Sequence, residues 1–339
     1  MANIYEIAKL TGFSPATVSK VINNYPDVSD KTRRLIEKVL AEQNFLPNSI
    51  AQSLTSKKTW TFGVVYQSGE QIGFNHPFFG NVLQVFKNKA EELGYSLLFA
   101  CKNEQMKGSS VVEYLIQKRV DGILLLSTCE VNPEIKRLVD SSIPLVAIDF
   151  NNHEVARITS DNRQGVNLAI QYLCNLGHRK IGYISGGNVG ENWISDLRRE
   201  AFINKCKELN ILVDLNYIQQ GTSFEVDGGI EAVKKFLKMK VPPTAICCVS
   251  DLQAIGVIRE FEKFGWGVPE DISIIGFDDL SFVEYCKPSL TTIRQDCHQL
   301  GSLCAEILKN QIISDKKSVR EIIVPVQLIK RDTCRPIKE

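Results

Sequence analysis

The spacing of hydrophobic residues changes about 60 residues into the chain. Before that point apolar residues recur at three- and four-residue intervals, as in short amphipathic helices. Beyond it, short apolar runs alternate with longer amphipathic stretches, which is typical of parallel strands joined by helices. The pattern therefore predicts an α-helical head at residues 1–58 and an α/β body at residues 60–333.

Local signals define the first two helices of the head. Asn3 and Glu6 form a capping box at the start of the first helix, and Gly12 ends it. Ser14 is a favourable N-cap, and Pro15 is favoured as the first residue of a helix. Two short helices joined through a glycine predict a helix-turn-helix.

A third helix closes the head. The second helix ends near Asn23, and the third begins after Ser29. Residues expected to form the shared apolar core are Ile4, Ile7, Ala8, Leu10, Val18, Val21, Leu35, Ile36, Val39 and Leu40.

The second helix has the size that fits the major groove of DNA. Lys20 can donate to guanine, Ala16 can touch a thymine methyl group, and the Thr17 hydroxyl suits a phosphate oxygen. Alternatively, a pair of short helices around a glycine can be purely structural. The candidate DNA-contacting residues here are Tyr5, Ser14, Pro15, Ala16, Thr17, Ser19, Lys20 and Asn23.

The charge distribution favours DNA binding by the head. Residues 1–58 hold eight Lys and Arg against five Asp and Glu, a balance of +3 in a chain whose net charge is +1. The remainder therefore carries −2. A basic head on a nearly neutral body suits phosphate binding by the head alone.

Three segments of the head carry a resemblance to a known family. They are Ile4-Tyr-Glu-Ile-Ala-Lys-Leu-Thr-Gly-Phe-Ser-Pro-Ala-Thr-Val-Ser-Lys-Val-Ile-Asn-Asn, Val28-Ser-Asp-Lys-Thr-Arg and Phe45-Leu-Pro-Asn-Ser-Ile-Ala-Gln-Ser-Leu. Together they resemble the head of the LacI/GalR family of bacterial regulators over its whole length. The resemblance implies a sequence-specific DNA-binding transcription regulator, with repression as the expected outcome.

The last of these segments can form a hinge helix at about residues 48–55, too short to be stable alone in water. The resemblance implies that it folds when two copies meet in the minor groove and Leu54 wedges between base pairs. Asn48, Ala51 and Leu54 are its candidate DNA contacts. Alternatively, it is an ordinary linker helix with Leu54 packed on the body. Gln52 stands where many family members carry Arg, so one phosphate contact is in doubt.

The sequence pattern of the body predicts seven strands and at least four helices. The strands are expected at residues 62–66, 96–100, 122–126, 145–148, 181–185, 245–249 and 273–277, and the helices at 79–93, 163–176, 225–237 and 251–264. Their alternation indicates parallel sheets with helices on both faces.

Motifs in the body extend the resemblance over nearly the whole chain. Among them are His76-Pro-Phe-Phe, Leu176-Gly-His-Arg-Lys-Ile, Val268-Pro-Glu-Asp-Ile, Ile275-Gly-Phe-Asp-Asp and Pro288-Ser-Leu-Thr-Thr-Ile. The resemblance implies two doubly wound parallel-sheet lobes like those of periplasmic binding proteins. It places lobe one at about residues 60–158 and 293–321, and lobe two at about 159–292 and 322–333.

Ligands of such sheets bind beyond the carboxyl ends of the strands. Sugars need carboxylate or guanidinium partners for adjacent hydroxyls and an aromatic face for the ring. We expect Asp149 to follow a strand, Arg198 to begin a helix, and Trp193 to lie in the loop before it. Each residue has a local alternative, as a cap, an ion-pair partner or a core side chain. The candidate effector-binding residues, matched to the family, are Phe78, Phe79, Asp149, Phe150, Trp193, Arg198, Ser250, Asp278, Gln295 and Cys297.

Three positions depart from the family pattern. Ser250 and His76 stand where Asn is frequent, and Cys297 stands where an aromatic residue is frequent. These residues are expected to tune ligand identity, which therefore cannot be copied from a relative.

Two rival functions were considered, a solute-binding receptor and a sugar-acting enzyme. The sequence lacks a Gly-x-Ser-x-Gly elbow, a phosphate-binding loop with lysine and a paired-histidine metal motif. Neither a cofactor nor a metal is expected, and the ten scattered cysteines are interpreted as reduced thiols. The N-terminus has no export signal and no membrane span is expected, so the prediction is a cytoplasmic homodimer on an inverted-repeat operator, controlled by a small sugar-like effector.

Overall fold

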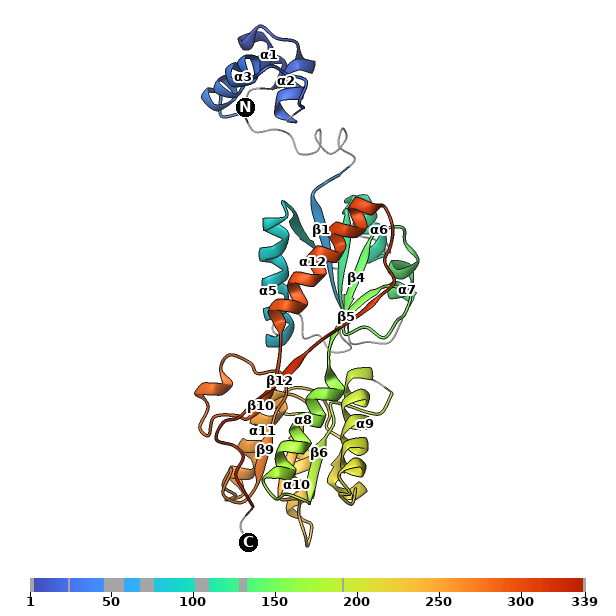
Figure 1. Ribbon diagram of the computed structural model, residues 1–339, viewed down its shortest axis with the longest axis vertical. Coiled ribbons are helices and arrows are strands. Elements are labelled where there is room, and N and C mark those ends of the chain that lie inside the picture. The colour runs from blue at the N-terminus through green and yellow to red at the C-terminus, as the bar shows by residue number, and fades with distance from the viewer. Residues whose placement is uncertain are drawn as a thin grey trace. The chain divides into compact units, whose positions relative to one another are not determined.

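The computed structural model describes residues 3–23, 25–45, 58–67, 76–100, 110–127, 133–190 and 192–337 (Figure 1). It divides into two compact units, Met1–Thr61 and Phe62–Glu339. The predicted hinge helix, with Asn48, Ala51 and Leu54, lies outside the described residues.

The first unit contains the three predicted helices, α1 (Ile4–Thr11), α2 (Pro15–Ile22) and α3 (Asp30–Glu42). The capping box at the start of α1 is present, and Gly12 ends that helix with a φ of 73°. The Ser14 hydroxyl accepts a hydrogen bond from the backbone of Thr17 and so caps α2. Since these caps satisfy backbone groups that a short helix leaves unpaired, local sequence determines where the helices begin.

Five residues form the buried core of this unit, namely Ile7, Ala8, Val18, Val21 and Ile36. The expectation that Leu10 and Leu35 also point inward is wrong, because their exposed fractions are 58% and 48%. Leu35 precedes Ile36, and consecutive residues of a helix point about 100° apart. In α3 it is Ile36 that faces the core, and Leu35 lies at the edge of the buried face.

One lobe of the second unit, the first lobe, contains a six-stranded sheet in the order β11-β5-β4-β3-β1-β2. Its strands are β1 (Thr61–Gln67), β2 (Ser96–Phe99), β3 (Gly122–Ser127), β4 (Leu145–Ile148), β5 (Ala156–Ser160) and β11 (Glu321–Val324). Its helices are α5 (Pro77–Glu92), α6 (Val111–Gln117), α7 (Pro133–Asp140) and α12 (Cys297–Ser314).

Alternate residues of β3 show why both faces of this sheet are covered. Leu124 and Leu126 belong to the core cluster that contains buried residues of α5 and α12. Ile123 and Leu125 belong to a separate cluster with residues of α6 and α7. Because neighbouring side chains of a strand point to opposite faces, a continuous apolar strand needs helices on both sides.

The second lobe has a four-stranded parallel sheet in the order β7-β6-β8-β9. Its strands are β6 (Ile181–Ile184), β7 (Ile218–Gln219), β8 (Ala245–Cys248) and β9 (Ser273–Ile275). Its helices are α8 (Asn162–Asn175), α9 (Trp193–Glu208), α10 (Ile230–Leu237) and α11 (Asp251–Lys263). The predicted α/β fold of two doubly wound lobes is confirmed.

Two short strands form a sheet of their own, β10 (Thr292–Gln295) and β12 (Val326–Ile329). They pair antiparallel, and Figure 1 shows them where the chain passes between the lobes. Strand β11 pairs with β5, so residues up to Val324 belong to the sheet of the first lobe. The sequence pattern did not single out β10, β11 or β12.

The seven predicted strands are present, and the largest differences between predicted and observed helices are the starts of α9 and α10. Helix α10 begins at Ile230 rather than at residue 225, because residues 225–229 form turns that include Gly228 and Gly229. Arg198 does not begin a helix, since α9 already begins at Trp193. Asn192 caps α9 by accepting hydrogen bonds from the backbone of Ile194 and Ser195.

Candidate functional site

The head presents a polar surface along α2. Ala16 and Lys20 are exposed, whereas Pro15, Thr17 and Ser19 are partly buried. Tyr5 on α1 has an exposed fraction of 72%, which is high for an aromatic residue. Tyr5, Ala16 and Lys20 are therefore exposed to solvent on the surface of the head.

Several of these polar groups already have partners within the head. The ammonium group of Lys20 forms an ion pair with Asp27, and this contact lowers the pKa of Asp27. The Ser14 and Thr17 hydroxyls lie 2.9 Å apart, and the Asn23 side-chain amide donates to the Ser19 carbonyl over 2.9 Å. Because the Lys20 pair is exposed, its stabilisation is small and phosphate can compete with Asp27 for the lysine.

Several buried polar residues of the body lie around Arg198 of α9. Arg198 itself is only 3% exposed. Its Nε donates to the Asn162 Oδ1 over 2.7 Å, and its Nη1 donates to the Val249 carbonyl at the end of β8. The guanidinium carbon lies 3.5 Å from the centre of the Phe277 ring. These contacts hold the guanidinium over the ring in a fixed orientation.

Gly165 makes room for that ring. A Cβ atom at residue 165 would lie 2.6 Å from the Phe277 ring. Real Cβ atoms essentially never approach so closely, so any larger residue here would displace Phe277. Phe277 in turn supports Arg198, and helix α8 therefore contributes to the site through a glycine.

A chain of hydrogen bonds joins Arg198 to the first lobe. Asn162, which accepts from Arg198, begins α8 and also approaches the Thr159 hydroxyl of β5, at 3.3 Å. The Thr159 hydroxyl donates to the Asp149 Oδ1 over 2.7 Å. The indole Nε1 of Trp193 donates to the Asp149 carbonyl over 2.7 Å. Two residues of α9 in the second lobe are thus linked to the end of β4 in the first lobe.

A second carboxyl group, that of Asp278, follows strand β9. Its Oδ1 accepts from the Gln295 Nε2 over 2.6 Å, and Gln295 ends β10. Asp149, Asp278 and Asp279 all have positive φ, at 51°, 128° and 57°. Non-glycine residues adopt such backbone conformations at a cost, and they cluster at functional sites.

The ionisable groups of this site shift one another's pKa values. Burial raises the pKa of Asp149 and of Asp278, and the neighbouring Arg198 acts against both increases. Burial also lowers the pKa of Arg198, while the two carboxyl groups raise it. Burial lowers the pKa of His76 to about 4, so His76 is neutral at pH 7. Arg198 is thus the cation that acts on these groups.

Some buried polar atoms have no hydrogen-bond partner among the described residues. Three of them are the His76 Nδ1, the Ser160 Oγ and the Gln295 Oε1. His76 is close enough to Arg198 for the charge of Arg198 to affect its pKa, Ser160 ends β5, and Gln295 binds Asp278. Leaving buried polar atoms unpaired is costly, so these atoms are candidates for contact with a bound polar molecule.

Several predicted effector residues have other contacts. Phe150 is 1% exposed and packs in the α6 and α7 core of the first lobe, and Phe78 and Phe79 pack in the cluster that includes α5. The Ser250 hydroxyl caps α11 and donates to the Phe224 carbonyl. Cys297 begins α12 and is partly buried. Burial is the main cause that raises the pKa of its thiol to about 12, and the nearby Asp278 carboxyl group adds to the increase.

The sequence analysis missed Thr159, Asn162 and Gln253. Thr159 and Asn162 connect Asp149 with Arg198, and a strand followed by Ser160, Asp161 and Asn162 was an available signal. Gln253 is fully buried in α11 and bonds the backbone at three points. A lone glutamine in an amphipathic helix gives no signal of this kind.

The described residues contain neither a membrane-spanning helix nor a cluster of metal ligands. No described helix is both long and apolar enough to cross a membrane. No group of three His, Cys, Asp or Glu side chains within the described ranges could hold a metal ion.

Comparison with known proteins follows the two units of the structure. The profile of bacterial regulatory proteins of the lacI family matches residues 3–48, and that of the periplasmic binding protein-like domain matches residues 170–334.

Similar proteins span the whole chain. The HTH-type transcriptional repressor PurR of Vibrio vulnificus is 32% identical over 343 residues, covering 99% of this chain and 100% of that protein. The ribose operon repressor of Haemophilus influenzae is 30% identical and covers 100% of both. The solved Lac repressor dimer bound to operator and the anti-inducer ONPF is 25% identical, with a TM-score of 0.84 over 98% of this chain and 99% of that one.

Proposed function

Since the chain belongs to the lacI family of bacterial regulatory proteins, we propose that it represses transcription from an inverted-repeat operator as a cytoplasmic homodimer. It is a DNA-binding transcription regulator controlled by a small-molecule effector. Its similar curated proteins are repressors rather than enzymes, and we assign it no catalytic role.

We assign operator recognition to α2, with Ala16 and Lys20 at base edges and Ser14, Pro15, Thr17, Ser19 and Asn23 supporting the backbone contacts. Tyr5 of α1 is assigned to the sugar-phosphate backbone. The support is the exposure of Ala16 and Lys20 on α2, which Ser14 caps at its N-terminus, and the exposure of Tyr5 on α1. Asn48, Ala51 and Leu54 of the hinge remain predictions.

We assign effector binding to the residues around Arg198. The observation that carries this assignment is the buried hydrogen-bond chain from Arg198 through Asn162 and Thr159 to Asp149, which joins the two lobes. A ligand that bonds to residues of both lobes stabilises one arrangement of the lobes over another. We include Asp278, Gln295, Trp193 and Cys297 in this site, and Phe78, Phe79, Phe150 and Ser250 as supporting residues.

The charge of the site favours a neutral, hydroxyl-rich effector such as a sugar. Arg198 already has the carboxyl groups of Asp149 and Asp278 beside it, and His76 is neutral at pH 7. A phosphate would therefore meet a single cation next to two carboxyl groups, whereas sugar hydroxyls can donate to these carboxyl groups and accept from Arg198. The H. influenzae relative is a ribose operon repressor, which makes D-ribose the first sugar to test.

The test combines a thermal-shift panel with DNA binding by the full chain. The panel contains D-ribose, D-glucose, cellobiose, ribose 5-phosphate and hypoxanthine. We expect a neutral sugar to stabilise the protein and to change its affinity for the DNA upstream of its own coding region by the coupling free energy, commonly about 1–3 kcal/mol.

The Arg198→Met variant is the matched control for this test. It should keep DNA affinity and lose the response to the sugar. Stabilisation by ribose 5-phosphate or hypoxanthine alone would contradict the sugar assignment. A chain that binds no specific DNA with or without the panel would contradict the regulatory role.

A further inference from the structure

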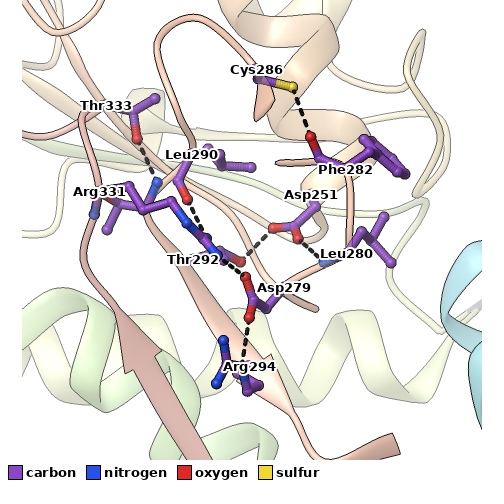
Figure 2. Close-up of polar contacts among 11 residues, drawn as sticks. Asp251, Asp279, Leu280, Phe282, Cys286, Leu290, Thr292, Arg294, Arg331 and Thr333 are labelled. Carbon is purple, nitrogen blue, oxygen red and sulfur yellow. Dashed lines mark hydrogen bonds and ion pairs between the residues drawn. The ribbon is translucent and has the colours of Figure 1, made fainter. Parts of the chain in front are cut away.

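A buried carboxylate follows Asp278 and binds two arginines at once. The Asp279 side chain is 6% exposed. Its Oδ2 accepts from the Arg294 Nε over 2.6 Å, and its Oδ1 lies 2.7 Å from the Arg331 Nη2 (Figure 2). Arg294 lies on β10, and Arg331 lies two residues beyond the end of β12. One carboxylate of the second lobe therefore holds two of the chain segments that connect the lobes, and the third connection is at Asp161, between β5 and α8.

The two ion pairs differ in solvent exposure. The Arg331 side chain is 14% exposed, and its Nη1 also donates to the Leu290 carbonyl over 2.8 Å. The Arg294 side chain is 50% exposed. Water screens exposed charges more than buried ones, so the pair with Arg331 contributes more to holding the strands.

Two other buried groups attach the same segments to the second lobe. Asp251 of α11 accepts from the Thr292 hydroxyl of β10 and, over 2.9 Å, from the Leu280 backbone (Figure 2). The Thr333 hydroxyl accepts from the Thr291 backbone over 2.9 Å and donates to the Ile274 carbonyl of β9 over 2.7 Å. The crossing strands thus have side-chain bonds to both α11 and β9.

The backbone at Asp278 continues this attachment. The Asp278 N–H donates to the Ile293 carbonyl over 2.8 Å, and the Gly276 N–H donates to the Thr291 carbonyl over 3.0 Å. Residues 276–278 therefore run along β10 as an additional short parallel pairing. Asp278, which we assign to effector binding, is thus hydrogen-bonded to β10. The next residue, Asp279, binds both arginines.

The connections toward the first lobe are different. Asp296 is the single residue between β10 and α12, and Pro325 is the single residue between β11 and β12. Strand β11 pairs with β5 of the first lobe, while β12 pairs with β10. At Pro325 the chain therefore passes from the sheet of the first lobe to the strand pair of β10 and β12, which is bonded to the second lobe.

We propose that Asp279 fixes β10 and β12 to the second lobe, so that in these two connections movement between the lobes is taken up at Asp296 and Pro325. A force on Asp278 then reaches the first lobe through β10 and α12. This last step rests on the proposed function of Asp278 in effector binding, whereas the fixing of the strands does not.

Hydrogen exchange of the full-length, ligand-free protein tests the proposal. In Asp279→Asn, the segments at residues 276–280, 290–295 and 326–333 should exchange about tenfold faster or more, because two arginines lose their partner. The segment at residues 145–148, in β4 of the first lobe, should be unchanged. Arg294→Gln, which removes only the more exposed pair, should give a smaller increase in the same three segments.

Arg163→Gln is the matched control. It breaks an ion pair with Glu200 in the same lobe, 2.9 Å long, whose side chains are 53% and 60% exposed, and it should change none of these segments. Unchanged exchange in both Asp279→Asn and Arg294→Gln, or an equal increase over both lobes, would overturn the proposal. Because no ligand or DNA is used, that failure is distinguishable from failure of the proposed function.

Discussion

Gln253→Met should destabilise the second lobe strongly although it conserves side-chain size. Gln253 is fully buried, and its Nε2 donates to the Ser185 carbonyl over 2.9 Å and to the Ser223 carbonyl over 3.0 Å. Its Oε1 accepts from the Val249 backbone over 3.2 Å. One side chain thus joins the end of β6, the end of β8 and the loop before α10.

The magnitude follows from the three backbone groups that methionine leaves unpaired. Each buried group without a partner costs about 1–3 kcal/mol, which gives a loss of about 3–9 kcal/mol for the three groups. For a protein of this size, about 2–4 °C of melting temperature is lost per kcal/mol, so we expect a decrease of at least about 6 °C. Val249 also accepts from Arg198, so effector affinity should fall as well.

Urea unfolding followed by circular dichroism, together with thermal melting, measures this loss. Gln164→Met is the matched control, because Gln164 is an exposed residue of α8 in the same lobe. A substitution at such a surface position should change stability by no more than about 0.5 kcal/mol. If Gln253→Met melted within about 2 °C of the parent protein, the three bonds would not hold these loops together and the reasoning would be refuted.

Three further predictions concern the two binding surfaces. Arg198→Lys keeps the charge but loses the planar contact on Phe277, so it should raise the Kd of the stabilising sugar at least about tenfold in calorimetry, and an unchanged Kd would exclude Arg198 from the site. Lys20→Met should weaken operator binding by about 1–3 kcal/mol and relax the preference for guanine at the contacted position, measured by fluorescence anisotropy, while Asp27→Asn, which removes the present partner of Lys20, should not weaken binding. His76 takes up a proton in the unfolded state at about pH 6.5 but in the folded state only at about pH 4. Lowering the pH through this window should therefore destabilise the parent by up to about 3 kcal/mol more than His76→Gln, and parallel stability curves would contradict the burial of a neutral His76.

The sequence by itself determined the elements whose signals are local. The caps at Asn3 and Ser14 are present where the sequence predicts them, and β4 occupies the predicted residues 145–148. Cap chemistry depends on residues three apart, and an apolar strand reveals its burial within a few positions. For the same reason the α/β class and the placement of Asp149 and Asp278 after strands could be predicted without coordinates.

Only the tertiary structure decided which polar groups meet. Arg198 and Asn162 are separated by 36 residues in the sequence, and Gln253 and Ser185 by 68. Asp279 and Arg331 are likewise distant along the chain, and β10 and β12 carry too few residues to show a periodic pattern. Partner choice depends on how whole sheets and helices pack, and no local spacing of residues encodes it. The sequence therefore indicated which side chains could bind an effector, whereas the packed lobes determined which of them are held together and to which strands they are tied.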